Sequence, residues 1–444
     1  MGYDLDILIS GGTVLTMSDG MNIVENCAIG ISEGTIHFVE TEEYLKTIDW
    51  QAKESIDATG SLILPGLVNT HTHLPMVCFR GLADDLPLMD WLNNYIFPAE
   101  ARFVNREMVY YGSMLAIAEM LLSGTTTFCD GYFYESSVAR AAIDAGIRSV
   151  SCQGFIDFPT TENPDPTNNI LIGEAFADKW TGVSPLITPA FFCHAPYTCS
   201  PETLATIKDL ARRRGFLYLT HLAETQEEIT TIVDRFGKTP VRHLYDLGIL
   251  DDRTVAVHCN WLDDEEIQIL ADCGTSVSHN PESSMKLAAG VAPIPKMLDA
   301  GVTVGLGTDG CASNNDLDLF TEMDTAAKIH KVTSMDPTVM DAQTVLRIAT
   351  IDGAKVLGLH DRIGSVEVGK RADLVIVDMQ KPHLTPCYNY YSHLVYAASG
   401  HDVSGVIIDG KIVVRDRILT TIDVDGVMER VREIAENIRK EHLT

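Results

Sequence analysis

Short apolar runs rich in β-branched residues recur along the middle of the chain and alternate with segments whose apolar residues follow helical spacing. Eight strand-like runs can be distinguished, at residues 62–73, 124–130, 148–157, 185–197, 216–224, 254–260, 274–281 and 302–309. Helix-like segments, such as 106–122, 201–214 and 263–272, lie between them. Eight parallel strand signals that alternate with helices predict an α/β protein with a (β/α)8 TIM barrel. A doubly wound sheet is the alternative, but no G-x-G-x-x-G pattern follows the first run to support it.

The two ends of the chain share a different pattern, in which short strand signals are bounded by turn residues. Such signals occur within the first 60 residues and return at residues 372–378 and 406–414. We therefore expect a small β-sandwich domain formed by residues 1–62 plus 367–444, and a catalytic barrel over residues 63–366.

Two further segments have a recognisable pattern. The last 20 residues carry apolar positions at helical spacing, which predicts an amphipathic helix: Val427, Val431, Ile434 and Ile438. Residues 158–184 are rich in Pro, Asn and Asp and include Trp180. We expect them to form a long loop that covers the site or meets a neighbouring subunit.

Composition excludes several classes of partner. The 444 residues contain 33 Lys plus Arg and 62 Asp plus Glu, which gives a net charge of −29. Nucleic acid and anionic membranes would repel such a chain. No apolar stretch is long enough to span a bilayer, and the first residues lack the features of a signal peptide. The ten cysteines are scattered without a C-x-x-C pair, which indicates buried free thiols and a cytoplasmic location.

Candidate chemistry first appears at His71 and His73, which follow the first apolar run. Residues i and i+2 of a strand share a face, so both imidazoles can point at one spot. Two convergent imidazoles favour a metal, although an isolated His-x-His is more often a pair of polar loop residues. The rest of the chain has to decide between these interpretations.

The other predicted strands also end in polar residues that can bind ligands. In chain order they are His194, His221 with Glu224 three residues on, His258, His279 and Asp309. A TIM barrel has its active site at the carboxyl ends of its strands, so these side chains are predicted to converge. One such residue could be a capping or loop residue, but recurrence at equivalent strand ends argues against that interpretation for the set.

Three histidines and one carboxylate would form a site suited to one divalent metal, most simply Zn²⁺, with Fe²⁺ or Mn²⁺ as alternatives. Such an ion lowers the pKa of a bound water to about 7. Asp309 could then accept a proton, His258 could orient the water, and Glu224 could carry a proton to a substrate nitrogen. The competing interpretation of Glu224 is a solvated loop carboxylate, since Glu227 and Glu228 follow it. No lysine ends the fourth strand, which favours one metal over two.

The sequence resembles the amidohydrolase superfamily, in its branch of nucleobase and nucleoside deaminases and triazine hydrolases. The motifs that carry the resemblance are PGLVNTHTH at 65–73, GLADDLPLMDWL at 81–92, HAPYTCS at 194–200, THLAET at 220–225, AVHCNWL at 256–262, SHNPESSMKL at 278–287 and GLGTDGCASNN at 305–315. They span nearly the whole predicted barrel in the expected order. Within this branch the chain looks most like S-adenosylhomocysteine/methylthioadenosine deaminases.

This resemblance implies a role for each candidate residue. It implies a metal site of His71, His73, His221 and Asp309, with Glu224 as proton shuttle and His258 as the partner of the attacking hydroxide. It further implies substrate contacts by His194 with the purine, by Trp91 in the pocket and by Glu100 with the ribose hydroxyls. Glu100 could instead be an ordinary residue on a surface helix.

The segment after the third strand departs from the family pattern. Gln153 ends that strand, and no arginine occurs between Arg148 and Arg212, where family members that bind the homocysteine carboxylate are expected to have arginines. Ser284 stands where an asparagine is expected. We therefore expect a preference for adenosines with uncharged 5′ groups, such as methylthioadenosine, 5′-deoxyadenosine or adenosine itself, over S-adenosylhomocysteine.

The leading hypothesis is hydrolytic deamination of an adenine nucleoside, a small-molecule substrate, to its inosine analogue. One alternative keeps the site and changes the substrate to an s-triazine or to guanine or cytosine. Another is a metal-free binding protein on the same barrel. The resemblance also implies a homo-oligomer, either a dimer or a tetramer.

Overall fold

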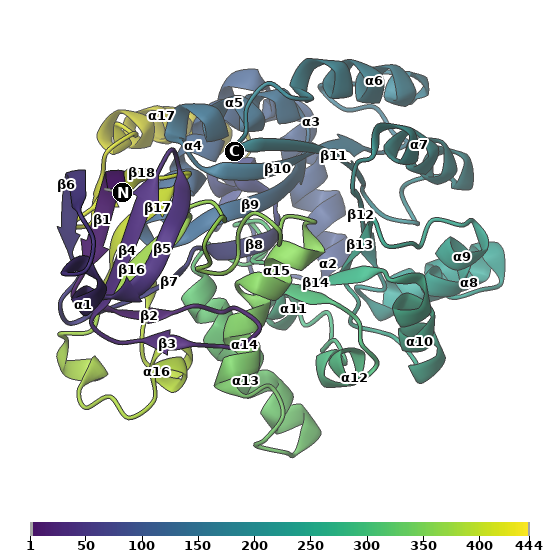
Figure 1. The fold of residues 1–444 in the computed structure, drawn as a ribbon. Helices are drawn as coiled ribbons and strands as arrows, with labels where there is room; N and C mark the ends of the chain where they lie inside the picture. The colour runs from purple at the N-terminus through teal and green to yellow at the C-terminus, as the bar shows by residue number, and fades with distance from the viewer. Residues whose placement is uncertain (1–2, 443–444) are drawn as a thin grey trace.

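Eight parallel strands form the centre of the computed structural model, which describes residues 3–442 (Figure 1). They are adjacent in chain order: β8 (Leu67–Thr72), β9 (Thr125–Tyr132), β10 (Arg148–Phe155), β11 (Ile187–Cys193), β12 (Tyr218–Leu222), β13 (Thr254–His258), β14 (Ser276–His279) and β15 (Val304–Leu306). The last and first strands meet where Asp309 N–H donates to the His71 carbonyl at 3.0 Å. The predicted (β/α)8 TIM barrel is confirmed.

Helices surround this barrel and connect its strands. They are α4 (Arg106–Leu122), α5 (Glu135–Ala145), α6 (Asn169–Trp180), α7 (Pro201–Arg214), α8 (Gln226–Phe236), α9 (Pro240–Asp246), α10 (Asp264–Cys273), α11 (Pro281–Lys286), α12 (Ile294–Asp299), α13 (Leu319–Ser334), α14 (Ala342–Ile348) and α15 (Ile351–Val356). Four short helical segments precede α4 and cover the barrel mouth: η1 (Leu74–Phe79), α2 (Leu88–Trp91), η2 (Leu92–Ile96) and α3 (Phe97–Phe103). Among residues 3–442, no helix has both the length and the apolar character needed to cross a membrane.

Apolar side chains fill the barrel below the site. Successive residues of a strand point to opposite faces, so every second residue enters the interior. Val150 and Cys152 of β10 belong to this inner cluster, as do Val255 and Val257 of β13. On β12, Leu219 lies in the same cluster, and His221 follows two residues later at the rim. The inward parity of this strand thus carries a polar side chain to the mouth of the barrel.

Two further sheets form the small β domain. One contains β5 (Thr35–Thr41), β4 (Cys27–Ser32), β1 (Tyr3–Ser10) and β6 (Trp50–Asp57). The other combines both chain ends: β19 (Ile418–Leu419), β18 (Lys411–Arg415), β17 (Val403–Ile408), β16 (Leu374–Asp378), β7 (Ser61–Pro65), β2 (Thr13–Leu15) and β3 (Ile23–Val24). Side chains from both sheets share one apolar core, so the predicted β-sandwich is confirmed.

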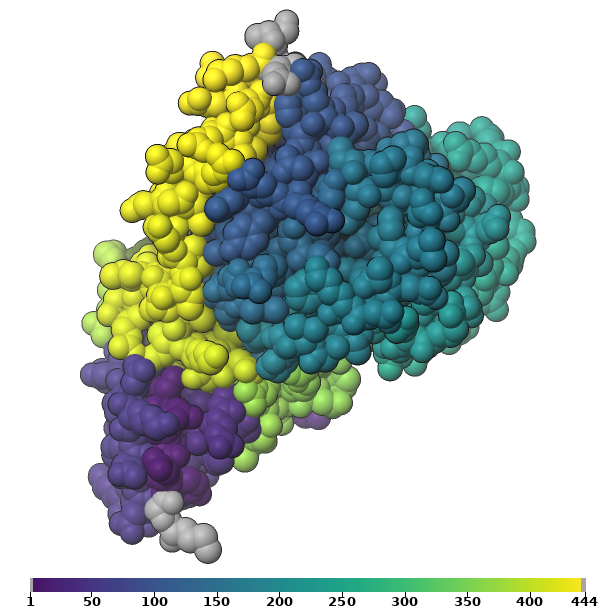
Figure 2. All heavy atoms as spheres, turned by 90° about the horizontal axis from the view of Figure 1, so that it is seen from above, coloured from purple at the N-terminus to yellow at the C-terminus, as the bar shows by residue number. Residues whose placement is uncertain are grey.

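The C-terminal segment forms the predicted amphipathic helix, α17 (Val424–His442). It lies along α4, and Arg430 pairs with Glu107 at 2.7 Å. Figure 2 shows this contact as the yellow C-terminal surface beside the blue part of the barrel. A deeper link joins the two domains: Arg148 at the start of β10 makes two hydrogen bonds to Asp373, at 2.7 and 3.0 Å.

Two expectations from the sequence need correction. Residues 62–73 are not one strand, because β7 pairs with the small β domain and β8 begins the barrel. Gly66 separates them, and a Cβ there would lie 1.9 Å from the Thr126 side chain, so the close approach requires glycine. The predicted boundary after residue 62 falls inside β7, and we propose Gly66 as the boundary instead. Residues 158–184 are not a long loop, since they contain η3 (Pro166–Asn168) and α6.

Candidate metal centre and substrate cavity

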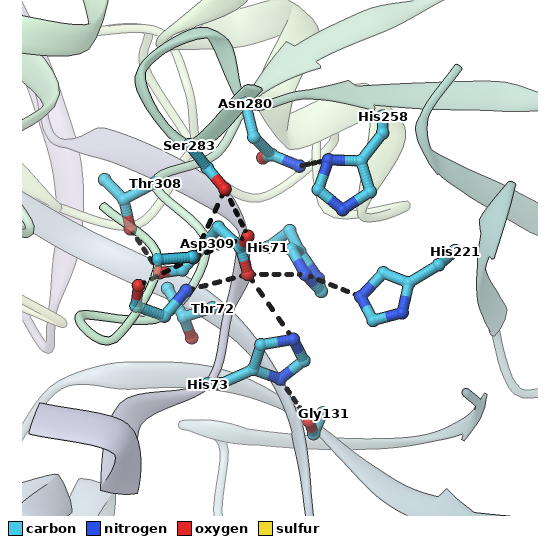
Figure 3. Close-up of polar contacts among 12 residues, drawn as sticks. His71, Thr72, His73, Gly131, His221, His258, Asn280, Ser283, Thr308 and Asp309 are labelled. Atoms are coloured by element: carbon cyan, nitrogen blue, oxygen red, sulfur yellow. Dashed lines mark hydrogen bonds and ion pairs between the residues drawn. The ribbon is translucent and has the colours of Figure 1, made fainter. Parts of the chain in front are cut away.

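Three imidazoles converge at the carboxyl ends of the barrel strands. The ligand atoms of His71, His73 and His221 all lie within 4.8 Å of one another. Nε2 of His221 is 3.3 Å from Nε2 of His71. Oδ1 of Asp309 is 3.4 Å from Nε2 of both His71 and His73. Figure 3 shows the four side chains pointing toward a common centre. The sequence-predicted ligand candidates are therefore brought together.

The chemistry of these donors fits a divalent cation. Burial lowers the pKa of His71 to about 4 and that of His221 well below its ordinary value, so both rings are neutral and have a free lone pair. His73 Nδ1 donates to the Gly131 carbonyl at 2.7 Å, which leaves the Nε2 lone pair facing the centre. Three imidazoles and a carboxylate form the donor set that Zn²⁺ and related ions prefer.

Asp309 is held as a carboxylate. Burial alone would raise its pKa, but the hydrogen bond with His71 and the nearby His73 and His258 keep the pKa well below its ordinary value. Its Oδ2 accepts hydrogen bonds from the hydroxyls of Ser283 at 2.6 Å and Ser313 at 2.9 Å. Oδ1 therefore faces the imidazoles, and the side chain can accept a proton at the centre.

Glu224 lies in the same cavity and is only 6% exposed, so the solvated-loop interpretation is wrong for this residue. Burial raises its pKa well above the ordinary value, and repulsion by Asp309 and Glu228 acts in the same direction. The raised pKa favours the protonated form of Glu224, which can donate a proton. Its Oε1 is 3.8 Å from Nε2 of His258.

From the sequence, Glu228 was interpreted as part of a solvated loop that follows Glu224, and this interpretation is also wrong. It is buried and accepts the main-chain N–H groups of Ala223 at 2.9 Å and Glu224 at 2.8 Å. The left-handed backbone of Ala223, with φ of +52°, turns the chain at this point. Thr225 caps α8 through the N–H of Glu228, and this T-x-x-E pattern was a signal that sequence reasoning missed.

His258 is oriented by Asn280, which was not predicted from the sequence to be a site residue. Asn280 Nδ2 lies 3.3 Å from Nδ1 of His258, and an amide nitrogen can only donate there. Nδ1 is thus the acceptor, so Nε2 carries the hydrogen. Burial lowers the pKa of His258 to about 3, which keeps the ring neutral. His258 can therefore donate one hydrogen bond toward an oxygen at the centre.

A cavity of about 740 Å³ opens above these residues. Eight of the ten predicted site residues line it: His73, Trp91, Glu100, His194, His221, Glu224, His258 and Asp309. His71 contributes to the metal centre but is absent from the lining. Gln153 does not line this cavity and faces a smaller one beside it. Most other lining residues are apolar, including Leu88, Phe133 and Ile156, as expected for a small-molecule site.

Glu100 is a buried residue of α3 and not a surface one. The hydroxyl of Tyr132 donates to its Oε1 at 2.5 Å. Burial raises the pKa of Glu100 to about 7, while the bond from Tyr132 acts to lower it. Tyr132 ends β9 and was missed, because nothing in the sequence links it to a helix 30 residues earlier. His194 lies at another side of the cavity, with Nδ1 2.8 Å from the Thr198 hydroxyl.

Comparison with known proteins agrees with this architecture. The amidohydrolase family model matches residues 62–413. A 5-methylthioadenosine/S-adenosylhomocysteine deaminase of Syntrophobacter fumaroxidans is 49% identical over 434 residues, 98% of each chain. A 5′-deoxyadenosine deaminase of Methanosarcina mazei is 45% identical, again over 98% of each chain. A crystal structure of an adenosine deaminase from Xanthomonas campestris with bound zinc has a TM-score of 0.96 and 39% identity, and the match covers 99% of this chain and 100% of that one.

The fold and the site define a barrel hydrolase with a histidine-rich metal centre. The family match covers well over half of the chain, and relatives above 40% identity span nearly all of it. This protein belongs to the amidohydrolase family, as the sequence motifs indicated.

Proposed function

We propose that the protein is a metal-dependent hydrolase that removes the 6-amino group of adenine nucleosides as ammonia. The observation that carries this proposal is the buried Glu224 beside the His71, His73, His221 and Asp309 centre, in a cavity that also contains the buried Glu100. The names of the relatives, which are deaminases of methylthioadenosine, S-adenosylhomocysteine and 5′-deoxyadenosine, support the same reaction.

One divalent ion would be held by His71, His73, His221 and Asp309. Zn²⁺ is the preferred candidate, because the donor set suits it and a solved relative contains zinc, with Fe²⁺ and Mn²⁺ as alternatives. When bound, such an ion lowers the pKa of water to about 7 and so supplies hydroxide at neutral pH.

Side chains of the protein would carry out the proton transfers of the reaction. Glu224 donates its proton to N1 of the purine, which makes C6 more electrophilic as the oxygen of water bonds to it. Asp309 accepts a proton from that water and delivers it to the amino group. The C6–N bond then breaks and ammonia leaves. The proton that remains on the C6 oxygen passes to Glu224, which restores that acid and leaves the inosine analogue. The Nε2–H of His258 orients the attacking oxygen.

The remaining predicted residues would position the nucleoside. His194 contacts the purine, Trp91 packs within the cavity, and Glu100 accepts hydrogen bonds from both ribose hydroxyls. Among the described residues that line the cavity there is no lysine or arginine, which supports a preference for 5′ groups without a carboxylate. Methylthioadenosine, 5′-deoxyadenosine and adenosine are therefore the substrates of choice over S-adenosylhomocysteine.

The cellular setting is also a proposal. All ten cysteines are free, and nine of them are buried or partly buried, which suits a reducing cytoplasm. The net charge of −29 argues against nucleic acid as a partner. We expect a homodimer or homotetramer, measurable by light scattering with mass determination.

A substrate panel tests the function. The purified, metal-loaded protein would be given adenosine, 5′-deoxyadenosine, methylthioadenosine, S-adenosylhomocysteine, guanine, cytosine and a chloro-s-triazine, with release of ammonia or chloride measured. We expect ammonia from the adenine nucleosides only, with the three uncharged 5′ groups preferred. Turnover confined to a triazine or a free base would replace the proposal. Comparable kcat/KM values for S-adenosylhomocysteine and methylthioadenosine would overturn the 5′ preference.

A further inference from the structure

A partly buried carboxylate, Glu162, lies beside the substrate cavity and has no part in the proposed reaction. The main-chain N–H of Tyr134 donates to its Oε2 at 2.7 Å, and Nε2 of Gln153 donates to the same oxygen at 2.9 Å. Among the described residues, no hydrogen bond to Oε1 is found, so this oxygen is available to a ligand. Gln153, which was predicted from the sequence to bind substrate, therefore also holds Glu162.

The segment around Glu162 is tied to the barrel on both sides. The hydroxyl of Tyr134 donates to the Thr161 carbonyl at 2.7 Å. Asn163 Nδ2 donates to Asn169 Oδ1 at 2.8 Å, and Asn169 Nδ2 in turn donates to the Ile156 carbonyl at 3.2 Å. Because these bonds anchor both neighbours of Glu162, its carboxylate is held in a fixed place.

Glu162 and Gln153 line a small cavity of about 240 Å³. This cavity shares three lining residues with the substrate cavity: Phe133, Gly154 and Ile156. The two cavities therefore adjoin at these residues. Among the residues that line the smaller cavity, Glu162 is the only charged one.

The proposed placement of the nucleoside would direct its 5′ group toward the residues that the two cavities share. In that placement C6 faces Glu224, which follows β12, and the ribose lies at Glu100, whose partner Tyr132 ends β9. The shared residues come from the ends of β9 and β10 and the positions just after them. A substituent on the 5′ carbon would thus extend from the ribose toward Gly154 and Ile156.

Burial and the groups around Glu162 act on its pKa in opposite directions. Burial raises the pKa above its ordinary value, while the bonds from Tyr134 and Gln153 and the charge of Arg106 limit this rise. Glu162 also lines an outer cleft, together with Arg106, Arg140 and Lys179. Arg106 favours the carboxylate from this side, and none of the three cations is among the described residues that line either inner cavity.

We propose that Glu162 makes the protein discriminate between substrates by the charge of the 5′ substituent. The protein would then also deaminate adenosines with a short 5′ aminoalkyl group. Its free Oε1 accepts a hydrogen bond from an ammonium group, and its charge repels a carboxylate. This inference rests on the proposed deamination and adds a substrate class to it. It also gives a physical reason for the discrimination against carboxylate-bearing substrates.

A matched set of three thioethers tests the inference. Methylthioadenosine is neutral, 5′-(2-aminoethylthio)-5′-deoxyadenosine carries an ammonium group, and 5′-(2-carboxyethylthio)-5′-deoxyadenosine carries a carboxylate of similar length. We expect the wild-type protein to give a kcat/KM for the ammonium compound at least about tenfold above that for the carboxylate compound. Glu162→Gln, which keeps the size and an acceptor oxygen, should reduce this ratio to within about threefold of unity. The control Glu202→Gln removes an exposed charge on α7 and should leave the ratio unchanged.

The outcomes separate the two proposals. A wild-type ratio at or below one, or a ratio that Glu162→Gln leaves unchanged, would overturn the role of Glu162 while methylthioadenosine is still deaminated. Failure of the wild-type protein to deaminate all three compounds would instead remove the proposed function. A loss of the ratio in Glu202→Gln as well would assign the effect to net charge and so overturn the inference. Comparison of the variants' far-ultraviolet circular dichroism and melting temperatures separates these results from misfolding.

Discussion

The carboxylate of Asp130 accepts a hydrogen bond from the main-chain N–H of Leu74 at 2.6 Å, one residue after His73. The same oxygen accepts the Thr72 hydroxyl at 2.8 Å. The next residue of β9, Gly131, accepts the ring N–H of His73. β9 therefore holds the segment that carries two of the three histidine ligands, although Asp130 itself is no ligand.

Loss of the hydrogen bonds that Asp130 accepts from Leu74 and Thr72 should weaken metal binding. We expect Asp130→Ala to reduce zinc affinity by about 10- to 100-fold, because groups that orient metal ligands contribute on that scale. Asp130→Asn keeps one acceptor oxygen and should lose less. Competition with a fluorescent zinc chelator measures the affinity. Asp361→Asn, at an exposed position, is the control. Equal affinity in wild type and Asp130→Ala would show that β8 holds the histidines unaided.

Glu224 should govern the chemical step. Glu224→Gln keeps the shape but has no acidic proton, so kcat should fall by about 10²- to 10⁴-fold, the usual contribution of a general acid or base. Metal content and melting temperature should stay close to the wild type. The neighbouring Glu227→Gln, which changes an exposed carboxylate, should keep full activity. A Glu224→Gln enzyme with most of its kcat would contradict the assigned role.

Glu100 should make nucleoside binding depend on pH. Burial raises its pKa to about 7, and only the charged form accepts hydrogen bonds from both ribose hydroxyls. KM should therefore rise as the pH falls below about 7, with a smaller effect on kcat. The bond from Tyr132 favours the charged form, so Tyr132→Phe should raise the pKa of Glu100 and move the KM inflection to higher pH.

Steady-state kinetics between about pH 5.5 and 9, a range that spans this pKa, provide the measurement. Phe103→Leu, at a partly buried site on the same helix α3, is a control for general disturbance of that helix. An inflection that stays in place in Tyr132→Phe would mean that the hydroxyl does not act through Glu100.

The buried pair of Arg148 and Asp373 should join the barrel to the small β domain. Both side chains are 1% exposed, so removal of either partner leaves a buried charge without its main counter-charge. Arg148→Met or Asp373→Asn should each lower the free energy of unfolding by about 3–5 kcal/mol. The double variant should lose less than the sum, because the partner left behind in each single variant is also gone. Urea unfolding measures all three, and strictly additive losses would contradict a coupled pair.

The sequence predicted much of the site because a TIM barrel converts order along the chain into position in space. His71, His221 and Asp309 each end an apolar run, and the fold brings the ends of those runs together. On β12, the alternation of side chains along the strand puts Leu219 inside the barrel and His221 at its rim. Residue type and position at a strand end were sufficient signals for these residues.

The groups that orient the ligands could not be predicted in this way. Asp130 ends an apolar run as well, but its function depends on the backbone of Leu74, 56 residues away. The role of Tyr132 depends on its hydrogen bond to Glu100, and the role of Glu162 depends on its hydrogen bond from Gln153. Such contacts arise only after the chain has folded. The break at Gly66 was missed because two strands of different sheets form one apolar run.

Deamination by protein with a defined metal content tests the central claim most directly. The protein would be stripped with a chelator, reloaded with increasing amounts of Zn²⁺, and assayed for ammonia release from 5′-deoxyadenosine. We predict no turnover without metal, full recovery at one ion per chain, and formation of the inosine analogue in equal amount to ammonia. Activity that survives complete metal removal, or no turnover of any adenine nucleoside at one ion per chain, would contradict the account.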